Sequence, residues 1–224
     1  MSVSSSQQLQ EHEKLHTLAR ATHPYFKIFA FVGASGAGKT TIIDRLRQQD
    51  PKFKLVESVT TRAPRETDRP GEYRNVSPKE FEEMQKADEF IWTTEYNGNL
   101  YGTTKQSVND ALKAKYPSLI HVVPERLITL RQYTLRAMPI FVSVSDETVL
   151  RERLKKRDPG QPETYYNERV ESCRNWKTEM KLCGFPYATI DNNCQSIEKF
   201  EEIVMESVIF NMKYPPQDIL DLVF

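Results

Sequence analysis

The sequence predicts an α/β protein with a central parallel sheet and a phosphate-binding loop after its first strand. Short apolar or β-branched runs alternate along the chain with amphipathic stretches, and the glycine-rich stretch "GASGAGKT" follows the first apolar run. Strands that alternate with helices form parallel sheets with right-handed crossovers. At 224 residues, the chain suits one domain with inserts, or at most two small domains.

The glycine-rich stretch fits the pattern G-x-x-x-x-G-K-[ST]. In this pattern, backbone N–H groups and the N-terminal end of the next helix hold phosphates. Lys39 is expected to reach the β- and γ-phosphates of ATP, and the Thr40 hydroxyl to ligate Mg²⁺. A glycine-rich turn that binds nothing is the alternative, but the strand "YFKIFAFV" before it and the amphipathic helix "TTIIDRLRQQ" after it favour binding. The expected nucleotide-binding residues of this loop are Gly33, Ser35, Gly36, Ala37, Gly38, Lys39, Thr40 and Thr41.

Composition and charge favour a soluble, cytoplasmic protein. Lys plus Arg and Asp plus Glu both number 31, which gives no support for a general attraction to nucleic acids or membranes. Cys173, Cys183 and Cys194 are an odd number without C-x-x-C spacing, which indicates a reducing compartment and no zinc site. The chain has neither an apolar run of about 18 residues nor a signal-peptide core. Residues 1–24 are expected to form an extension that the chemistry does not need.

The elements that follow the loop can be expected in order. "FKLVESVTTR" is expected to form the second strand because it is rich in β-branched residues, and "APRETDRPGEYRNVS" a polar loop broken by prolines. "SPKEFEEMQKADEF" predicts a helix capped by Ser77, with proline at its first position and with Phe81, Met84 and Ala87 on one face.

A hairpin and a second series of strands and helices come next. "FIWTTEYNGNLYGTT" predicts a hairpin that turns at Asn97 and Gly98. "SLIHVVP" and "MPIFVSVS" are expected as buried strands on either side of the helix "ERLITLRQY". The long stretch from "DETVL" to "TEMK" predicts helices with a break at Asp158-Pro159-Gly160. "FPYATID" and "SIEKFEEIVMESVIFNM" are expected as a last strand and helix, followed by a tail at 209–224.

A second group of polar residues indicates a site for another phosphate. "SVTTRAPR" supplies Arg62 and Arg65, and Tyr73 and Tyr101 follow in later segments. Two arginines and two phenols on opposite sides of a cleft can clamp one phosphate, since arginine donates through a bidentate fork and tyrosine through its hydroxyl. A solvated polar loop is the alternative interpretation of the two arginines.

The order of these motifs resembles that of guanylate kinases. "GASGAGKT", "SVTTRAPR", "GEYRNVS" with "EFEEM", and "NGNLYGTT" occur in the order found in that family, and the resemblance runs from about Ile28 to about Met205. It implies a nucleoside-monophosphate kinase that uses ATP and Mg²⁺, with GMP, dGMP or a related modified nucleotide as the acceptor. It also implies a three-layer P-loop domain at 25–208, an acceptor-binding insert with a small β-sheet at about 58–104, and a helical lid at about 151–172. A monomer or homodimer with a small-molecule phosphate acceptor, and without nucleic-acid or membrane partners, is expected.

The resemblance also implies roles for individual residues. Lys39 and three lid arginines would act on the transferring phosphate, and Asp191 lies where the family has an asparagine that contacts adenine. The lid arginines are Arg153, Arg157 and Arg169. The implied acceptor-binding residues are Ser58, Arg62, Arg65, Tyr73, Trp92, Tyr101 and Thr103, of which Thr103 resembles the residue that touches guanine.

Two departures from the family pattern concern the base. Trp92 stands where the family has a glutamate that accepts hydrogen bonds from guanine, and His121 and Val123 stand where it has carboxylates. A buried donor left unpaired costs about 1–3 kcal/mol, so guanine specificity does not follow from the sequence. Three roles stay open for Trp92: it stacks on a different base, fills the space of an absent base, or is a core residue. Glu95 would replace the lost acceptor only if the strand were shifted, and His121 is expected to be a core histidine.

Three functions remain open from sequence. The first is an ATP-dependent nucleoside-monophosphate kinase, and the second is a kinase of the same fold that acts on a phosphorylated ribose, like the ribose bisphosphate phosphokinases. The third is a non-catalytic guanylate-kinase-like module that binds phosphopeptides. Lys39, Thr40 and the lid arginines disfavour the third, because a binding module needs none of them.

Overall fold

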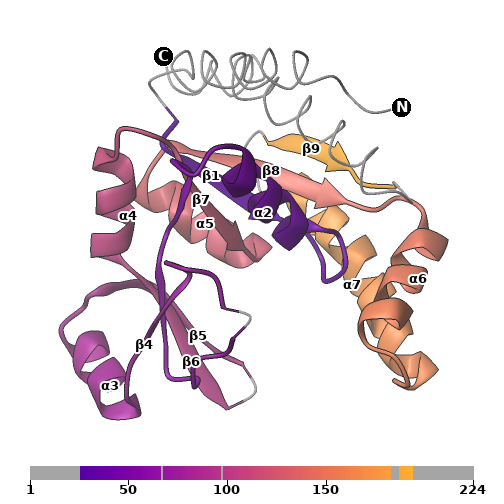
Figure 1. Cartoon of the computed structure of the whole chain (residues 1–224), viewed down its shortest axis with the longest axis horizontal. Coiled ribbons are helices and arrows are strands. Elements are labelled where there is room, and N and C mark those ends of the chain that lie inside the picture. The colour runs from indigo at the N-terminus through magenta and orange to yellow at the C-terminus, as the bar shows by residue number, and fades with distance from the viewer. Residues whose placement is uncertain (1–25, 67, 97, 183–186, 194–224) are drawn as a thin grey trace.

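The computed structural model describes residues 26–66, 68–96, 98–182 and 187–193 (Figure 1). The expected N-terminal extension, the final helix, the tail at 209–224 and two of the three cysteines, Cys183 and Cys194, lie outside the described residues. In the described part of the chain, no helix combines the length and apolar character needed to cross a membrane.

A parallel sheet of five described strands forms the centre of the molecule, in the order β2-β7-β1-β8-β9. Every neighbouring pair in it runs parallel, as the alternation of strands and helices predicted. The strands are β1 (Ile28–Val32), β2 (Lys54–Leu55), β7 (Ser118–Val122), β8 (Ala137–Ser143) and β9 (Ala188–Asp191).

Helices cover both faces of this sheet, which explains why β1 is apolar at every position. Phe29 and Phe31 of β1 belong to a cluster on one face, whereas Ile28, Ala30 and Val32 belong to a cluster on the other. The first cluster receives side chains from α2 (Lys39–Gln49), α6 (Glu147–Arg157) and α7 (Glu163–Leu182), and the second from α4 (Lys105–Lys113), α5 (Pro124–Tyr133) and the end of α7. The result is the predicted three-layer arrangement.

A separate four-stranded sheet forms the insert, with strand order β4-β3-β6-β5. Its strands are β3 (Ser58–Thr60), β4 (Tyr73–Asn75), β5 (Phe90–Tyr96) and β6 (Asn99–Thr104). It lies below the main sheet in Figure 1, with α3 (Pro78–Lys86) at its outer end. Phe81 and Met84 of α3 pack with Val59 and Phe90 against one face of the insert sheet.

The hairpin and the helix start are confirmed. β5 and β6 are antiparallel, and their register joins Tyr96 to Asn99 across the predicted turn, although Asn97 itself lies outside the described residues. The Ser77 hydroxyl accepts the backbone N–H of Glu80 at 3.1 Å and so caps α3. Ala87 was expected on the buried face but is exposed, because α3 ends one residue before it.

Two expectations about the strands are corrected. "FKLVESVTTR" does not form one strand: β2 pairs with β7 in the main sheet, and β3 pairs in the insert sheet. Val56 lies between them and is buried in the main core, whereas Val59 is buried against α3. The two halves of the segment therefore pack in two separate hydrophobic clusters. The expected polar loop contains β4, which pairs with β3 as a partly exposed edge strand.

The expected helical region is divided where the sequence predicted a break. α6 ends at Arg157 and α7 begins at Glu163. The Asp146 carboxylate accepts the backbone N–H of Thr148 at 2.9 Å and so caps the start of α6.

Gly33, the first residue of the phosphate loop, approaches β8 too closely to carry a side chain. A Cβ atom at Gly33 would lie 2.2 Å from the backbone carbonyl oxygen of Val142. We therefore expect Gly33→Ala to lower the free energy of unfolding by about 1–3 kcal/mol, the usual cost of forcing atoms into a packed site, when measured by urea denaturation.

Gly160→Ala is the control for this prediction. Gly160 has a φ of +79°, and a Cβ atom there would meet nothing within 4 Å, so only backbone strain of about 1 kcal/mol is expected. A Gly33→Ala protein as stable as the wild type would contradict the packing argument.

Candidate active site

The phosphate loop connects β1 to α2 at the carboxyl end of the main sheet. Gly38 is the N-cap of α2, and its carbonyl accepts the N–H of Ile42 at 3.0 Å. The loop is closed by a bond from the N–H of Ala37 to the carbonyl of Ala34 at 3.2 Å. Because the first N–H groups of a helix have no partners within it, the start of α2 forms an anion-binding position.

Lys39 folds back over this loop. Its ammonium group donates to the carbonyl oxygens of Gly33 and of Ala34, the latter at 3.1 Å, and lies 5.8 Å from the centre of the Trp176 ring. Burial lowers the pKa of Lys39 to about 8, and the positive charge of Arg157 acts in the same direction. A cation whose charged form is disfavoured in this way fits a site for anionic phosphates. Thr40, in the first turn of α2, is exposed.

The lid arginines contact different partners. Arg153 donates to the Asn192 side-chain oxygen at 3.2 Å, and the Asn192 amide donates to the carbonyl of Ala37 in the phosphate loop at 2.8 Å. Asn192 is buried, with 3% of its surface exposed. It therefore joins α6 to the loop, a role that the sequence analysis missed because nothing in the local pattern marks it.

Arg157 and Arg169 lie together in a second group at the end of α6. Arg157 donates to the Asp158 carboxylate at 3.0 and 2.6 Å, and the Tyr165 hydroxyl donates to the same oxygen at 2.8 Å. The Arg169 guanidinium lies 4.9 Å from the centre of the Tyr165 ring. The hydrogen bonds from Arg157 and then Tyr165 lower the pKa of Asp158. The structure thus brings two of the three lid arginines together around one carboxylate.

Asp191 lies at the end of β9 and holds the turn before α6. Its carboxylate accepts the backbone N–H of Ser145 at 3.0 Å, the Ser145 hydroxyl at 2.6 Å and the Asn193 amide at 2.9 Å. Asp191, which was predicted to bind the nucleotide, thus stabilises the local backbone between β8 and α6.

The insert sheet gathers five of the predicted acceptor residues on one face, which we call the acceptor face. In the register of the sheet, Thr103 lies opposite both Ser58 and Trp92, and Ser58 lies opposite Tyr73. Directly opposite residues of neighbouring strands point to the same side. The Ser58 and Thr103 hydroxyls are 3.4 Å apart. The Tyr73 and Tyr101 rings meet edge to face, with their centres 6.2 Å apart.

Arg62 joins the acceptor face, whereas Arg65 points to solvent. Arg62 is 8% exposed, lies 5.2 Å from the centre of the Tyr73 ring, and donates to Asp68 at 2.6 Å. Arg65 is exposed, and its backbone N–H donates to the other Asp68 oxygen at 2.8 Å. The hydrogen bond from Arg62 lowers the pKa of Asp68. Asp68 was not predicted, and its ion pair holds Arg62 beside Tyr73.

Trp92 is partly buried and packs against the core cluster that includes α5. Glu95 lies opposite Leu100 and, by strand alternation, on the other face of the sheet from Trp92. The irregularity in this pairing lies between Phe90 and Trp92 and does not shift Glu95 relative to Trp92. Glu95 therefore does not replace the carboxylate of the family pattern, and the row of Tyr73, Ser58, Thr103 and Trp92 in the described sheet holds no carboxylate.

His121 is not the core histidine that the sequence predicted. The other residues of β7 are buried, but His121, next to the carboxyl end of the strand, is exposed. The surrounding protein nevertheless displaces enough water to lower the pKa of His121, and the positive charge of Lys39 adds to this effect, whereas Glu72 opposes it. The apolar run was misleading because its end reaches the edge of the sheet where the phosphate loop lies.

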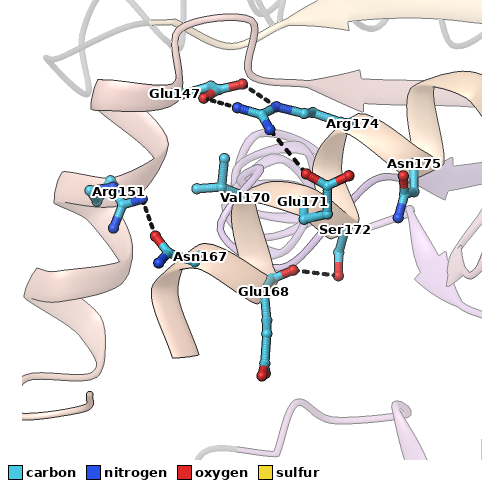
Figure 2. Close-up of a pocket in the computed structure, with 9 residues that line it drawn as sticks. All are labelled: Glu147, Arg151, Asn167, Glu168, Val170, Glu171, Ser172, Arg174 and Asn175. Atoms are coloured by element: carbon cyan, nitrogen blue, oxygen red, sulfur yellow. Dashed lines mark hydrogen bonds and ion pairs between the residues drawn. The ribbon is translucent and has the colours of Figure 1, made fainter. Parts of the chain in front are cut away.

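An open pocket of about 580 Å³ lies between α6 and α7 (Figure 2). In its lining, Arg174 binds Glu147 and Glu171, and Arg151 donates to Asn167 at 2.5 Å. None of the predicted site residues lines it. Its lining residues are Glu147, Arg151, Asn167, Glu168, Val170, Glu171, Ser172, Arg174 and Asn175.

The chain is similar to known proteins over most of its length. Residues 25–207 match the model of the guanylate kinase family. The guanylate kinase of Gloeobacter violaceus is 30% identical over 191 residues, which are 84% of this chain and 91% of that protein. That of Helicobacter pylori is 30% identical over 185 residues, 82% of this chain and 86% of that protein.

A solved structure agrees with these matches at the level of the fold. The crystal structure of guanylate kinase from Anaplasma phagocytophilum has a TM-score of 0.56 and 18% sequence identity, and the match covers 85% of this chain and 87% of that one. Because the family model spans most of the chain and the relatives are 30% identical to it over most of their length, this chain belongs to the guanylate kinase family.

Proposed function

We propose that this protein transfers the γ-phosphoryl group of ATP to a nucleoside monophosphate, with GMP and dGMP as the first candidates. One observation supports the proposal: a complete phosphate-loop pattern follows one sheet, and Arg62 and Tyr73 lie in contact on the open face of the second sheet of the same chain. The relatives in the comparison are named guanylate kinases. We further propose that the protein acts in the cytoplasm, as a monomer or homodimer, on a small-molecule acceptor.

Lys39 and the lid arginines are assigned to the donor side. Phosphoryl transfer depends on positioning and on neutralising charge at the transferring group. Lys39 would turn from the carbonyls of Gly33 and Ala34 to the phosphates, which would compensate the charge that burial disfavours. Arg157 and Arg169 would exchange contacts with Asp158 and Tyr165 for contacts with the transferring group, and Arg153 acts beside the loop through Asn192.

Mg²⁺ would be held by Thr40 together with the nucleotide, and it supplies charge neutralisation on the β- and γ-phosphates. The remaining loop residues, from Gly33 to Thr41, would hold the phosphates through the backbone, and Asp191 is assigned to the adenine side. The domain is proposed to span 25–208, with the insert at about 58–104 and the lid at about 151–172.

The acceptor phosphate is assigned to the acceptor face. Arg62 and Tyr73 are already in contact there, with Tyr101 beside them. Arg65 is exposed and can turn toward the same phosphate. Ser58 and Thr103 would supply hydroxyl groups between the phosphate and the base. An incoming phosphate has to compete with Asp68 for Arg62, which makes this contact conditional on a strong anionic partner.

Trp92 favours a second acceptor class, a phosphorylated ribose. The indole ring takes up space on the acceptor face beside Thr103 and packs on the main core. A smaller acceptor would need the phosphate contacts without the base contacts. The same residues would then perform the same transfer on a different molecule.

Lys39→Ala tests the phosphoryl-transfer proposal. The variant is expected to fold and to lose at least about 10²- to 10³-fold in kcat, since removing one preorganised donor to developing charge has effects of that size. The rate of ADP formation with acceptor present measures the loss. Lys105→Ala, which removes an exposed ammonium paired with Asp88, is the control and should retain wild-type turnover. A folded Lys39→Ala protein with near wild-type kcat would rule out the mechanism.

Trp92→Glu tests how the base is read. Guanine offers N1–H and N2–H₂ donors, and a restored carboxylate should raise kcat/KM for GMP relative to AMP by about tenfold, because pairing one such donor contributes about 1–3 kcal/mol. Glu95→Gln is the matched control on the opposite face and should leave the ratio unchanged. A strong wild-type preference for GMP that survives both changes would show that Thr103 and backbone groups read the base instead.

A further inference from the structure

A tight turn in the insert places two charged side chains together. The N–H of Glu72 donates to the carbonyl of Arg69 at 3.0 Å and closes the turn Arg69-Pro70-Gly71-Glu72. Gly71 has a φ of +77°, and proline followed by a glycine with positive φ is typical of a type II turn. The turn brings the Arg69 guanidinium to 3.1 Å from a Glu72 carboxylate oxygen.

Arg69 reaches from this turn to α2. Its Nε and Nη2 donate to the two carboxylate oxygens of Asp44, the second at 2.9 Å. Bidentate pairs of this kind are both strong and directional. The Arg69 and Asp44 side chains are 24% and 37% exposed, so water screens the pair less than a fully exposed one. The hydrogen bond with Asp44 makes the largest contribution to the raised pKa of Arg69.

A second hydrogen bond joins α2 to the same turn. Arg47, one turn further along α2 than Asp44, donates to the carbonyl of Pro70 at 3.0 Å. Pro70 belongs to the turn that carries Arg69 and Glu72. The turn is therefore attached to α2 through a side chain and through its own backbone.

The ion pairs of Arg69 with Asp44 and Glu72, which we call the Arg69 bridge, join the two halves of the proposed active site. Asp44 follows Thr40 by four residues in α2, so the two lie on the same face of the helix. Glu72 precedes Tyr73, and its carbonyl accepts the N–H of Ser58 at 2.9 Å. The bridge thus runs from the helix of the phosphate loop to the strands of the acceptor face.

We propose that Arg69 is a positioning residue for phosphoryl transfer. By binding Asp44 and Glu72 at once, it sets the distance and angle between the acceptor face and the phosphate loop. The role rests on the proposed kinase function and deepens it, because the reaction depends on the alignment of attacking oxygen, phosphorus and leaving oxygen. A bridge between the two phosphate sites limits how far they drift apart between turnovers.

Three variants test this role: Arg69→Ala, Asp44→Ala and the double variant. Arg69→Ala is expected to lower kcat by about 10- to 100-fold, the range for a small misplacement of reacting groups, and to raise KM for the acceptor. The dissociation constant for ATP alone should stay within about twofold, because the phosphate loop is intact. The double variant should lose no more kcat than Arg69→Ala alone, since both changes remove the same bridge.

Arg69→Lys separates a geometric role from a simple charge. Lysine keeps the positive charge but lacks the planar fork that holds two carboxylates. The kcat of the Arg69→Lys variant is therefore expected to lie between those of Arg69→Ala and the wild type. Recovery of the full wild-type kcat by lysine would contradict the bidentate bridge.

The chain offers a matched control in Arg174. This arginine also binds one carboxylate in bidentate fashion, that of Glu147 at 2.5 and 2.6 Å, and a second carboxylate, Glu171, at 3.0 Å (Figure 2). Its bridge joins α6 to α7 and does not reach the acceptor face. Arg174→Ala should therefore leave KM for the acceptor unchanged.

The outcomes are distinguishable. If Arg69→Ala keeps wild-type kcat and acceptor KM while the wild type is active, the positioning role is wrong and the kinase function stands. If Arg174→Ala raises the acceptor KM as much as Arg69→Ala, the effect is a general loss of ion pairs and the role is also wrong. If the wild type phosphorylates no acceptor, the proposed function itself fails.

Discussion

The concentration of positive charge at the carboxyl end of the main sheet is the constraint on which the rest of the site depends. Burial disfavours the charged form of Lys39, and the positive charge of Arg157 acts in the same direction. Nearby hydrogen-bond acceptors stabilise these positive charges. Backbone carbonyls hold Lys39, and Asp158 holds Arg157; in the insert, Asp68 holds Arg62 in the same way. In the proposed reaction, phosphate oxygens would replace these acceptors.

The same logic explains why the site spans two sheets. The phosphate loop follows β1, which is buried on both faces, and Gly33 at its start packs against the backbone of β8. The acceptor face needs one open side, and α3 covers only the opposite side of the insert sheet. The buried strand and the open face belong to different sheets, and the chain passes from the main sheet to the insert sheet between β2 and β3. The Arg69 bridge then connects the strands of the acceptor face to the helix that follows the phosphate loop.

The parts predicted from sequence are those that fixed spacing or local chemistry encodes. The phosphate loop, the Ser77 cap, the hairpin and the break before α7 are of this kind, and the acceptor residues met on one face because strand alternation is regular. What the sequence did not reveal depends on long-range contacts. Asn192 and Asp44 reach the site through partners far away in the chain. His121 looked like a core residue because its neighbours in β7 are apolar, and its exposure depends on where the sheet ends.

The central claim is that ATP and a monophosphate react on this protein, and ³¹P NMR of the wild type with ATP, Mg²⁺ and one acceptor at a time tests it most directly. GMP, dGMP, AMP, dTMP and ribose phosphates form the panel. The account predicts that at least one acceptor gains a phosphoryl group, with one ADP formed for each product molecule. A protein that binds ATP but leaves every acceptor unchanged, or that releases only inorganic phosphate, would contradict it.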